Sequence, residues 1–410
     1  AKLNKTPAFI NKQFGLTPEN VDQIITFEGV TVTLKTDKAY APSFVYNCLT
    51  AGVANIVDMK TVMEHEVDGD MGNAWLKANS AGTGAYILKS FKPNEGYVLE
   101  ARQGHWRGDA KIKNVFMQHI PEGATERLLL EKGDIDIARE MTPTDIEGIA
   151  GNADLKVQGD VGGQVYYLAL NQKKAELANP KVQEAMRWAI DYTGMQDSIL
   201  KGQWVVHQDF LPLGFLGALD ENPYSLDIEK AKALMAESGL TLPVDIGFTV
   251  RNNQERLDIA TSIQNTFSQI GINLVLDVGD GKQGLETYRG RKHDITLQTW
   301  GPDYPDPHTN ASTFAMNPDN SDEANATGYL AWRTAWDVGA ELNAATAAAV
   351  EEKDSAKRAE MYADIQRKVR DNSAFVLMFQ QARQDAMRAN VSGFYAGGAT
   401  DSATYWTITK

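Results

Sequence analysis

Eight consecutive residues, Trp300-Gly301-Pro302-Asp303-Tyr304-Pro305-Asp306-Pro307, combine side chains suited to holding a small ligand. The three prolines fix three backbone angles and remove three hydrogen-bond donors, so the segment has little conformational freedom to lose when a ligand binds. The Asp303 carboxylate can accept hydrogen bonds from an ammonium group, and Trp300 offers a face for stacking or cation–π contact. Tyr304 adds an aromatic body with a polar tip. These residue types indicate a rigid loop that binds a cationic or amine-bearing group.

Two other roles for the acids stay open at this point. Asp303 and Asp306 can simply accept hydrogen bonds from nearby backbone N–H groups in turns, as Asp often does in Pro-rich segments. They also form a pair of carboxylates, which glycoside hydrolysis requires, with one of them acting as the acid. Nothing in the sequence marks either residue as that acid, so a hydrolase is the weaker hypothesis.

The position of the loop favours ligand binding. Strands are predicted over residues 244–250, 272–277 and 294–299, and the helices over 255–270 and 283–288 separate them. A βαβαβ pattern implies a parallel sheet with right-handed crossovers, and such sheets bind ligands beyond the carboxyl ends of their strands. The loop follows the last of these strands directly.

Further elements are predicted on either side of this segment. The apolar stretch Val165–Asn171 predicts a strand covered on both faces, and Asn179-Pro180 marks the start of a helix. Ser355 is expected to cap a helix that ends near Asn372, and Phe375–Phe379 is expected to form a strand.

No other pattern in the chain supports catalysis or a cofactor. None of the six histidines has a second His at metal-ligand spacing, and the acidic stretch around Glu64-His65-Glu66 is expected to be a solvated loop. Gly82-Thr83-Gly84-Ala85-Tyr86 is expected to be a turn that opens a strand, because no phosphate-loop pattern follows it. The single cysteine, Cys48, is expected to be a small buried side chain. We therefore expect neither a metal nor a cofactor.

Composition limits the class of protein. The chain has 410 residues, 43% of them hydrophobic, and two or three domains are expected. A net charge of −14 argues against nucleic-acid and anionic-membrane partners. No apolar run is long enough to cross a bilayer, and residues 1–15 do not have the layout of a secretory signal. They are typical of the middle of a domain, so we expect that an N-terminal portion is absent.

Several motifs, in order along the chain, resemble those of the periplasmic solute-binding proteins for dipeptides, oligopeptides and nickel, the substrate-binding subunits of ABC importers. Five segments carry the resemblance: Gly82–Tyr86, Arg102–Trp106, Gly133–Asp136, Leu170-Asn171 with Asn179–Val182 and Ala189–Asp191, and the loop Trp300–Pro307. The likeness runs from about residue 30 to Lys410 and is specific to the family rather than to one ligand.

The resemblance implies an α/β, periplasmic-binding-protein-like, two-lobed fold with mixed sheets, interleaved domains and an extra β-rich domain. The expected divisions are the remainder of the extra domain over 1–78, lobe I over 79–195 and 382–410, and lobe II over 196–381. It implies no enzyme activity but capture of a short peptide or similar amine-bearing solute, followed by delivery to permease subunits. Oligosaccharides and opines remain alternative ligands, with Trp204, Trp300 and Tyr167 as possible stacking residues for a sugar. A periplasmic monomer is expected.

The resemblance also assigns roles to individual residues. In peptide-binding members an Asp at the position of Asp303 holds the α-amino group of the peptide. The Arg that oligopeptide binders place before the Trp to hold a carboxylate corresponds here to Leu297, which leaves that contact to Arg256, Arg251 or Arg289. The ligand-binding residues we predict are Asp303, Trp300, Tyr304, Gly301, Asn171, Tyr167 and Arg256.

Overall fold

The βαβαβ segment predicted from the sequence is present in the computed structural model. Its strands are β9 (Val244–Arg251), β10 (Ile272–Gly279) and β11 (Ile295–Trp300), and its helices are α12 (Gln254–Ser268) and α13 (Gly281–Arg289). Both β10 and β11 pair with β9 in parallel, so the carboxyl ends of all three strands lie at one edge of the sheet. The predicted position of the Trp300–Pro307 loop, directly after a parallel strand, is confirmed.

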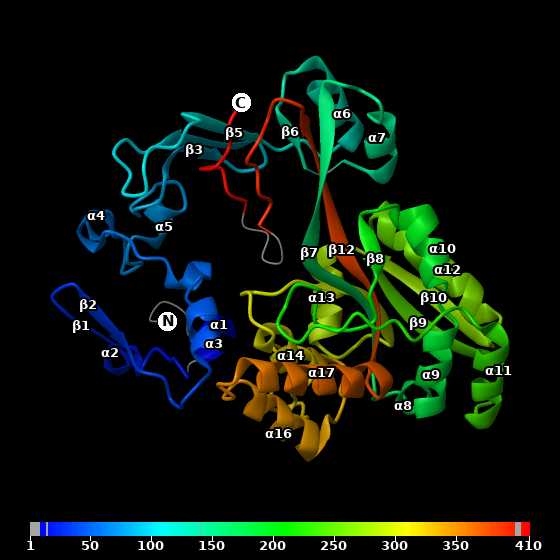
Figure 1. Ribbon diagram of the computed structural model, residues 1–410. Coiled ribbons are helices and arrows are strands. Elements are labelled where there is room, and N and C mark those ends of the chain that lie inside the picture. Colours follow the sequence, from blue (N-terminus) through cyan, green and yellow to red (C-terminus); the bar gives the residue numbers. More distant parts are fainter. Residues whose placement is uncertain (1–8, 14, 140, 398–402) are drawn as a thin grey trace. The chain divides into compact units, whose positions relative to one another are not determined.

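The structure describes residues 9–13, 15–139, 141–397 and 403–410, and these form two compact units (Figure 1). Of the described residues, those within 1–39, 45–160 and 384–410 form the first unit, and those within 40–44 and 161–383 form the second. Residues 161–195 therefore lie in the second unit, and the division into three domains stays a prediction.

A mixed sheet organises the second unit. Its strands follow the order β10-β9-β11-β7-β12, where β7 is Leu155–Leu170, β12 is Phe375–Arg388, and β8 (Trp204–Val206) also pairs with β12. Strand β11 runs antiparallel to β7, with Trp300 opposite Val165. The remaining helices of this unit are α8 (Ala175–Ala178), α9 (Pro180–Trp188), α10 (Tyr192–Met195), the π-helical turn η2 (Gln196–Leu200), α11 (Ile228–Glu237), α14 (His308–Phe314), α15 (Leu330–Arg333), α16 (Gly339–Ala349) and α17 (Ser355–Asp371).

Apolar side chains cover both faces of this sheet. On one face the strands pack with α9, α11 and α12 in a single core, to which β7 contributes Tyr166, Leu168 and Leu170. On the other face Tyr167 meets Phe314 of α14, whose ring also packs against Phe375 of β12. Residues Val165–Leu170 are all buried, which confirms the prediction of a strand covered on both sides.

Both helices whose starts were predicted are present in the structure, as α9 and α17. The Asn179 side chain accepts a hydrogen bond from the Lys181 N–H at 3.0 Å and begins α9. At α17 the capping residue is Asp354 rather than Ser355, because the Asp354 carboxylate accepts from the Lys357 N–H at 2.9 Å. The prediction was one residue late, since a carboxylate at the preceding position serves the same purpose.

The first unit contains short helices and two small antiparallel sheets, β1-β2 and β3-β4-β5. The β3 strand opens after the Gly82–Ala85 turn, as predicted, and β6 pairs with the far end of β12. The elements are α1 (Phe9–Gln13), α2 (Val21–Ile24), β1 (Ile25–Glu28), β2 (Thr31–Leu34), α3 (Pro42–Cys48, which continues from the second unit), η1 (Gly52–Ala54), α4 (Met59–Met63), α5 (Asn73–Leu76), β3 (Tyr86–Lys92), β4 (Gly96–Ala101), β5 (Asn114–Gln118), α6 (Gly123–Lys132), β6 (Ile137–Ala138) and α7 (Pro143–Gly148).

Cys48 is fully buried, as predicted for a small apolar side chain. Among the helices that the structure describes, none combines the length and the hydropathy needed to cross a bilayer.

A buried histidine at the amino end of β11, His293, predicts a pH-dependent stability for the second unit. His293 is 2% exposed, its two ring nitrogens have no hydrogen-bond partner among the described residues, and burial lowers the pKa of its imidazole to about 4. Because the unfolded chain binds the proton near pH 6.5 and the folded chain does not, stability is lost as the pH falls from about 6.5 to 4, by up to about 3 kcal/mol.

We therefore expect His293→Phe to flatten the acid side of the stability profile. Urea unfolding midpoints at pH 7.5, 6 and 5 would measure this, and the variant should also gain about 1 kcal/mol at pH 7.5 because two unpartnered nitrogens are removed. The pKa of buried His207 is lowered too, so part of the slope should remain. Equal slopes for the variant and the wild type would contradict the assignment to His293.

Candidate ligand-binding site

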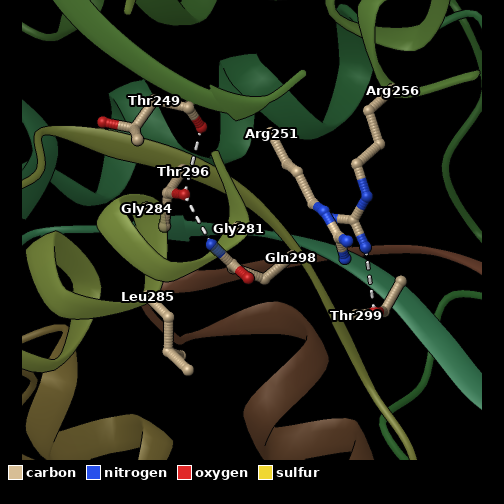
Figure 2. A pocket seen from close by; sticks show the side chains of 9 residues that line it. All are labelled: Thr249, Arg251, Arg256, Gly281, Gly284, Leu285, Thr296, Gln298 and Thr299. Carbon is tan, nitrogen blue, oxygen red and sulfur yellow. Dashed lines mark hydrogen bonds between the residues drawn. The ribbon is translucent and has the colours of Figure 1, made fainter. Parts of the chain in front are cut away.

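A cavity of about 170 Å³ lies at the carboxyl ends of β9 and β11, beside the first turns of α13. Figure 2 shows the nine residues that line it: Thr249, Arg251, Arg256, Gly281, Gly284, Leu285, Thr296, Gln298 and Thr299. All of them belong to the second unit. The cavity therefore lies at the edge of the parallel sheet where the sequence predicts a ligand.

Two arginines enter this cavity from neighbouring positions. Arg256, in the first turn of α12, donates to the Leu297 carbonyl and to the Thr299 hydroxyl, both at 3.1 Å. Arg251 ends β9, and its side chain makes no hydrogen bond or ion pair with any residue that the structure describes. Figure 2 shows both arginine side chains among the nine that line the cavity. Arg256 is thus held in position, whereas Arg251 has its donors available.

The lining also contains hydroxyl and amide groups. The Thr296 hydroxyl donates to the Thr249 carbonyl at 3.1 Å and accepts from the Gln298 amide at 2.9 Å. Thr299, which accepts from Arg256, keeps its own proton to donate. Guanidinium groups and hydroxyl donors together form a site suited to a carboxylate or another oxyanion.

Asp303 lies four residues beyond Thr299 and is exposed to solvent. Its backbone N–H donates to the Thr309 hydroxyl at 3.1 Å, while its carboxylate has neither a hydrogen-bond donor nor a cation partner in the described part of the chain. The surrounding protein partly desolvates the carboxyl group and raises its pKa above the usual 3.8. The structure therefore does not support the alternative in which Asp303 accepts hydrogen bonds from backbone N–H groups in a turn. Its carboxylate is available for a ligand.

Asp306 has the opposite environment. Its two oxygens accept from the two terminal nitrogens of Arg358, each at 2.8 Å, and both side chains are buried. One oxygen also accepts from the His308 N–H at 3.0 Å. The ion pair between Asp306 and Arg358 thus connects the loop to α17. Because the Asp306 carboxylate is buried in this pair, it is not placed to act as the second acid of a hydrolase.

Aromatic contacts also hold the part of the loop around Asp306. Phe44, from the short segment 40–44, packs edge-on against Tyr304 and His308, with ring centroids 5.9 and 5.5 Å apart. The Tyr362 hydroxyl lies 3.2 Å from Nδ1 of His308. The loop is therefore rigid because of packing and an ion pair as well as its prolines.

The predicted site residues differ in their accessibility. Trp300 is half-buried, with its indole N–H directed to the Asn310 side chain at 3.2 Å, and Gly301 is exposed. Tyr304 and Tyr167 are fully buried, and Trp204 is 6% exposed, so these three rings present no face for stacking on a sugar. The Asn171 amide donates to the carbonyls of Arg291 and His293.

The structure thus brings Arg256 and Thr299 together next to the Asp303 loop, while Asn171 and Tyr167 make packing or backbone contacts. Of the other residues that line the cavity, Arg251 was predicted only as an alternative to Arg256, and Gly281 and Gly284 were not predicted as site residues. A charged residue at the end of a parallel strand is the signal that identifies Arg251. No group of three or more His, Cys, Asp or Glu side chains that would suit a metal ion occurs among the described residues.

A family model supplies the identification. Residues 2–322 match the model of the bacterial extracellular solute-binding proteins, family 5, middle region. The chain belongs to this family. Its members are transport-associated binding proteins rather than enzymes, and the resemblance inferred from the sequence motifs is confirmed.

The relatives agree with this assignment. The chain is 29% identical over 370 residues to the "Probable D,D-dipeptide-binding periplasmic protein DdpA" of Escherichia coli K12, an alignment that covers 89% of this chain and 68% of that protein. It is 29% identical over 255 residues to the nickel-binding periplasmic protein of the same organism, covering 57% and 48% of the two chains. The chain thus spans about half to two thirds of the length of these relatives.

A solved structure supports the fold. The periplasmic binding protein DppA of Helicobacter pylori, in complex with the peptide STSA, superposes with a TM-score of 0.80 at 19% identity, over 98% of this chain and 77% of that one. The expected two-lobed solute-binding fold with a mixed sheet is therefore confirmed.

Proposed function

We propose that this family 5 solute-binding protein captures a short peptide, or a similar solute with an amino group, and delivers it to the permease of an ABC importer. The observation that carries the proposal is an available carboxylate, that of Asp303, four residues from a cavity with two guanidinium groups. Such an arrangement complements a ligand that is positive at one end and negative at the other.

The spacing along the chain is compatible with a short ligand. Four residues of chain span at most about 14 Å between the Cα atoms of Thr299 and Asp303. A peptide of two to four residues keeps its two ends within the same span. We therefore propose that Asp303 binds the α-ammonium group and Arg256 the terminal carboxylate, with Trp300 beside the ligand.

The cellular setting follows from the same proposal. The relatives are periplasmic proteins, and we propose that this chain acts in the periplasm as a monomer that binds one solute at a time and contacts the permease subunits. Closure of two lobes on the ligand would give the ligand-bound protein a different shape from the ligand-free protein, and the permease could distinguish the two.

A thermal-shift screen tests the proposal. Zwitterionic di- to tetrapeptides of L and D configuration should raise the unfolding temperature, because a ligand that binds the folded state at 100 times its Kd stabilises it by about 2.7 kcal/mol. Peptides blocked at both ends are the control and should give little shift. Strong stabilisation by oligosaccharides without any by amine-bearing solutes would overturn the peptide assignment, and turnover of a chromogenic glycoside would indicate an enzyme.

A further inference from the structure

The cavity carries more positive charge than is needed to bind one terminal carboxylate. Two of the nine lining residues, Arg251 and Arg256, are positively charged, and none is acidic. A single guanidinium satisfies a carboxylate with its bidentate fork. The second guanidinium is therefore available for a second anionic group.

The two arginines are held differently. Arg256 bonds to Leu297 and Thr299, and its guanidinium carbon lies 5.2 Å from the centre of the Tyr166 ring. Arg251 lies against Gly281, where an added Cβ would be 2.9 Å from its Nε atom. Glycine at the start of α13 thus leaves the space that Arg251 occupies.

The acids that adjoin Arg256 and Gly281 in the sequence, Glu255 and Asp280, have other hydrogen-bond partners. Glu255 accepts from the Tyr166 hydroxyl at 2.7 Å and from the Trp204 indole N–H at 3.3 Å. Asp280 caps α13 by accepting from the Gln283 N–H at 2.8 Å. Neither acid forms an ion pair with Arg251 or Arg256 within the ranges that the structure describes.

We propose that the cavity selects ligands whose anionic end carries two negative charges, namely peptides with Glu or Asp as the C-terminal residue. Arg256 holds the α-carboxylate and Arg251 holds the side-chain carboxylate, with the Thr299 hydroxyl as a further donor. This inference rests on the proposed function and names the class of solute that the same site prefers.

Isothermal titration with Ala-Glu, Ala-Gln and Ala-Lys, and with the tripeptides that carry one more Ala, tests the preference. Ala-Glu and Ala-Gln have nearly the same shape, so a difference between them reports charge. We expect Ala-Glu to bind about tenfold or more tightly than Ala-Gln, with Ala-Lys weakest and the preference reduced by salt.

Two variants assign the effect to a residue. Arg251→Gln should reduce the preference for Glu over Gln to about twofold or less, because the affinity for Ala-Glu falls much more than the affinity for Ala-Gln. Lys282→Gln removes the same charge from an exposed neighbour that does not line the cavity, and it should keep the preference.

The outcomes separate this inference from the proposed function. Equal binding of Ala-Gln and Ala-Glu by the wild type would overturn the inference while leaving peptide binding intact. An Arg251→Gln variant that keeps the preference, or that weakens both peptides equally, would also overturn it. If no peptide of either length binds, the proposed function and this inference fail together.

Discussion

We expect Arg358→Met to lower the free energy of unfolding of the second unit by about 3–5 kcal/mol, the typical loss when one partner of a buried ion pair is removed. The reason is the environment of Asp306, which is 1% exposed and accepts two hydrogen bonds from Arg358. Without the guanidinium, a carboxylate remains in a site where water cannot solvate it. Urea unfolding followed by tryptophan fluorescence would measure the change.

The partner substitution should show that the two residues act as a pair. Asp306→Asn alone leaves the Arg358 charge buried, and we expect a loss of similar size. The double variant should lose less than the sum of the two, with an interaction energy of about 0.5–3 kcal/mol or more. Additive losses would contradict direct coupling across the pair.

An exposed ion pair on the same helix provides a matched control. Lys368, also on α17, contacts Glu341 at 2.6 Å, and both side chains are largely exposed. Water and salt screen such a pair, so Glu341→Gln should leave the unfolding midpoint unchanged within experimental error. A loss as large as that of Arg358→Met would show that α17 responds to any charge change and not to burial.

The elements of the parallel sheet could be predicted because local patterns specify them. Apolar runs separated by an amphipathic helix identified β9, α12 and β10, and the glycine at 271 marked the end of the helix. The position of the loop after β11 followed from that order alone. These features depend on residues close together in the sequence, which is why they were accessible without a structure.

The partners of the loop could not be predicted, because they come from distant parts of the chain. Arg358 is 52 residues from Asp306, and Phe44 reaches Tyr304 across 260 residues. The sequence showed two similar acids three residues apart, and only tertiary contacts separate the buried Asp306 from the exposed Asp303. The same limit applies to Tyr167 and Asn171, whose polar groups were as compatible with a site as with the packed interior in which they lie.

Arg251 illustrates a different limit. Its position at the end of a strand was visible, yet an arginine at such a place is more often a solvated surface charge. The cavity next to it depends on where α13 begins and on two glycines without side chains. The shape of this cavity depends on the side chains that Gly281 and Gly284 lack as well as on the residues that line it. The pattern of charges along the sequence does not show where such a cavity forms.

The Asp303→Asn variant should lose affinity for zwitterionic peptides by about 10- to 150-fold, which corresponds to the 1.5–3 kcal/mol typical of a hydrogen bond to a charged group. The substitution keeps the shape of the side chain and removes the charge that an ammonium group would contact. Isothermal titration with a peptide that binds the wild type would measure the loss. Asp319→Asn is the control, because Asp319 is an exposed loop carboxylate that accepts from the side chain and the backbone N–H of Ser321 and does not line the cavity.

A second ligand makes this prediction specific for the amino group. N-acetylation removes the positive charge from the peptide, so the acetylated form should bind the wild type weakly and Asp303→Asn about equally weakly. Because partial desolvation by the surrounding protein raises the pKa of the Asp303 carboxyl above 3.8, wild-type affinity for the free peptide should decline as the pH falls toward that raised value, and the variant should lack this dependence. If Asp303→Asn weakened the free and acetylated peptides by the same factor, the ammonium group would have to be bound elsewhere, since a residue that contacts it must distinguish the two ligands.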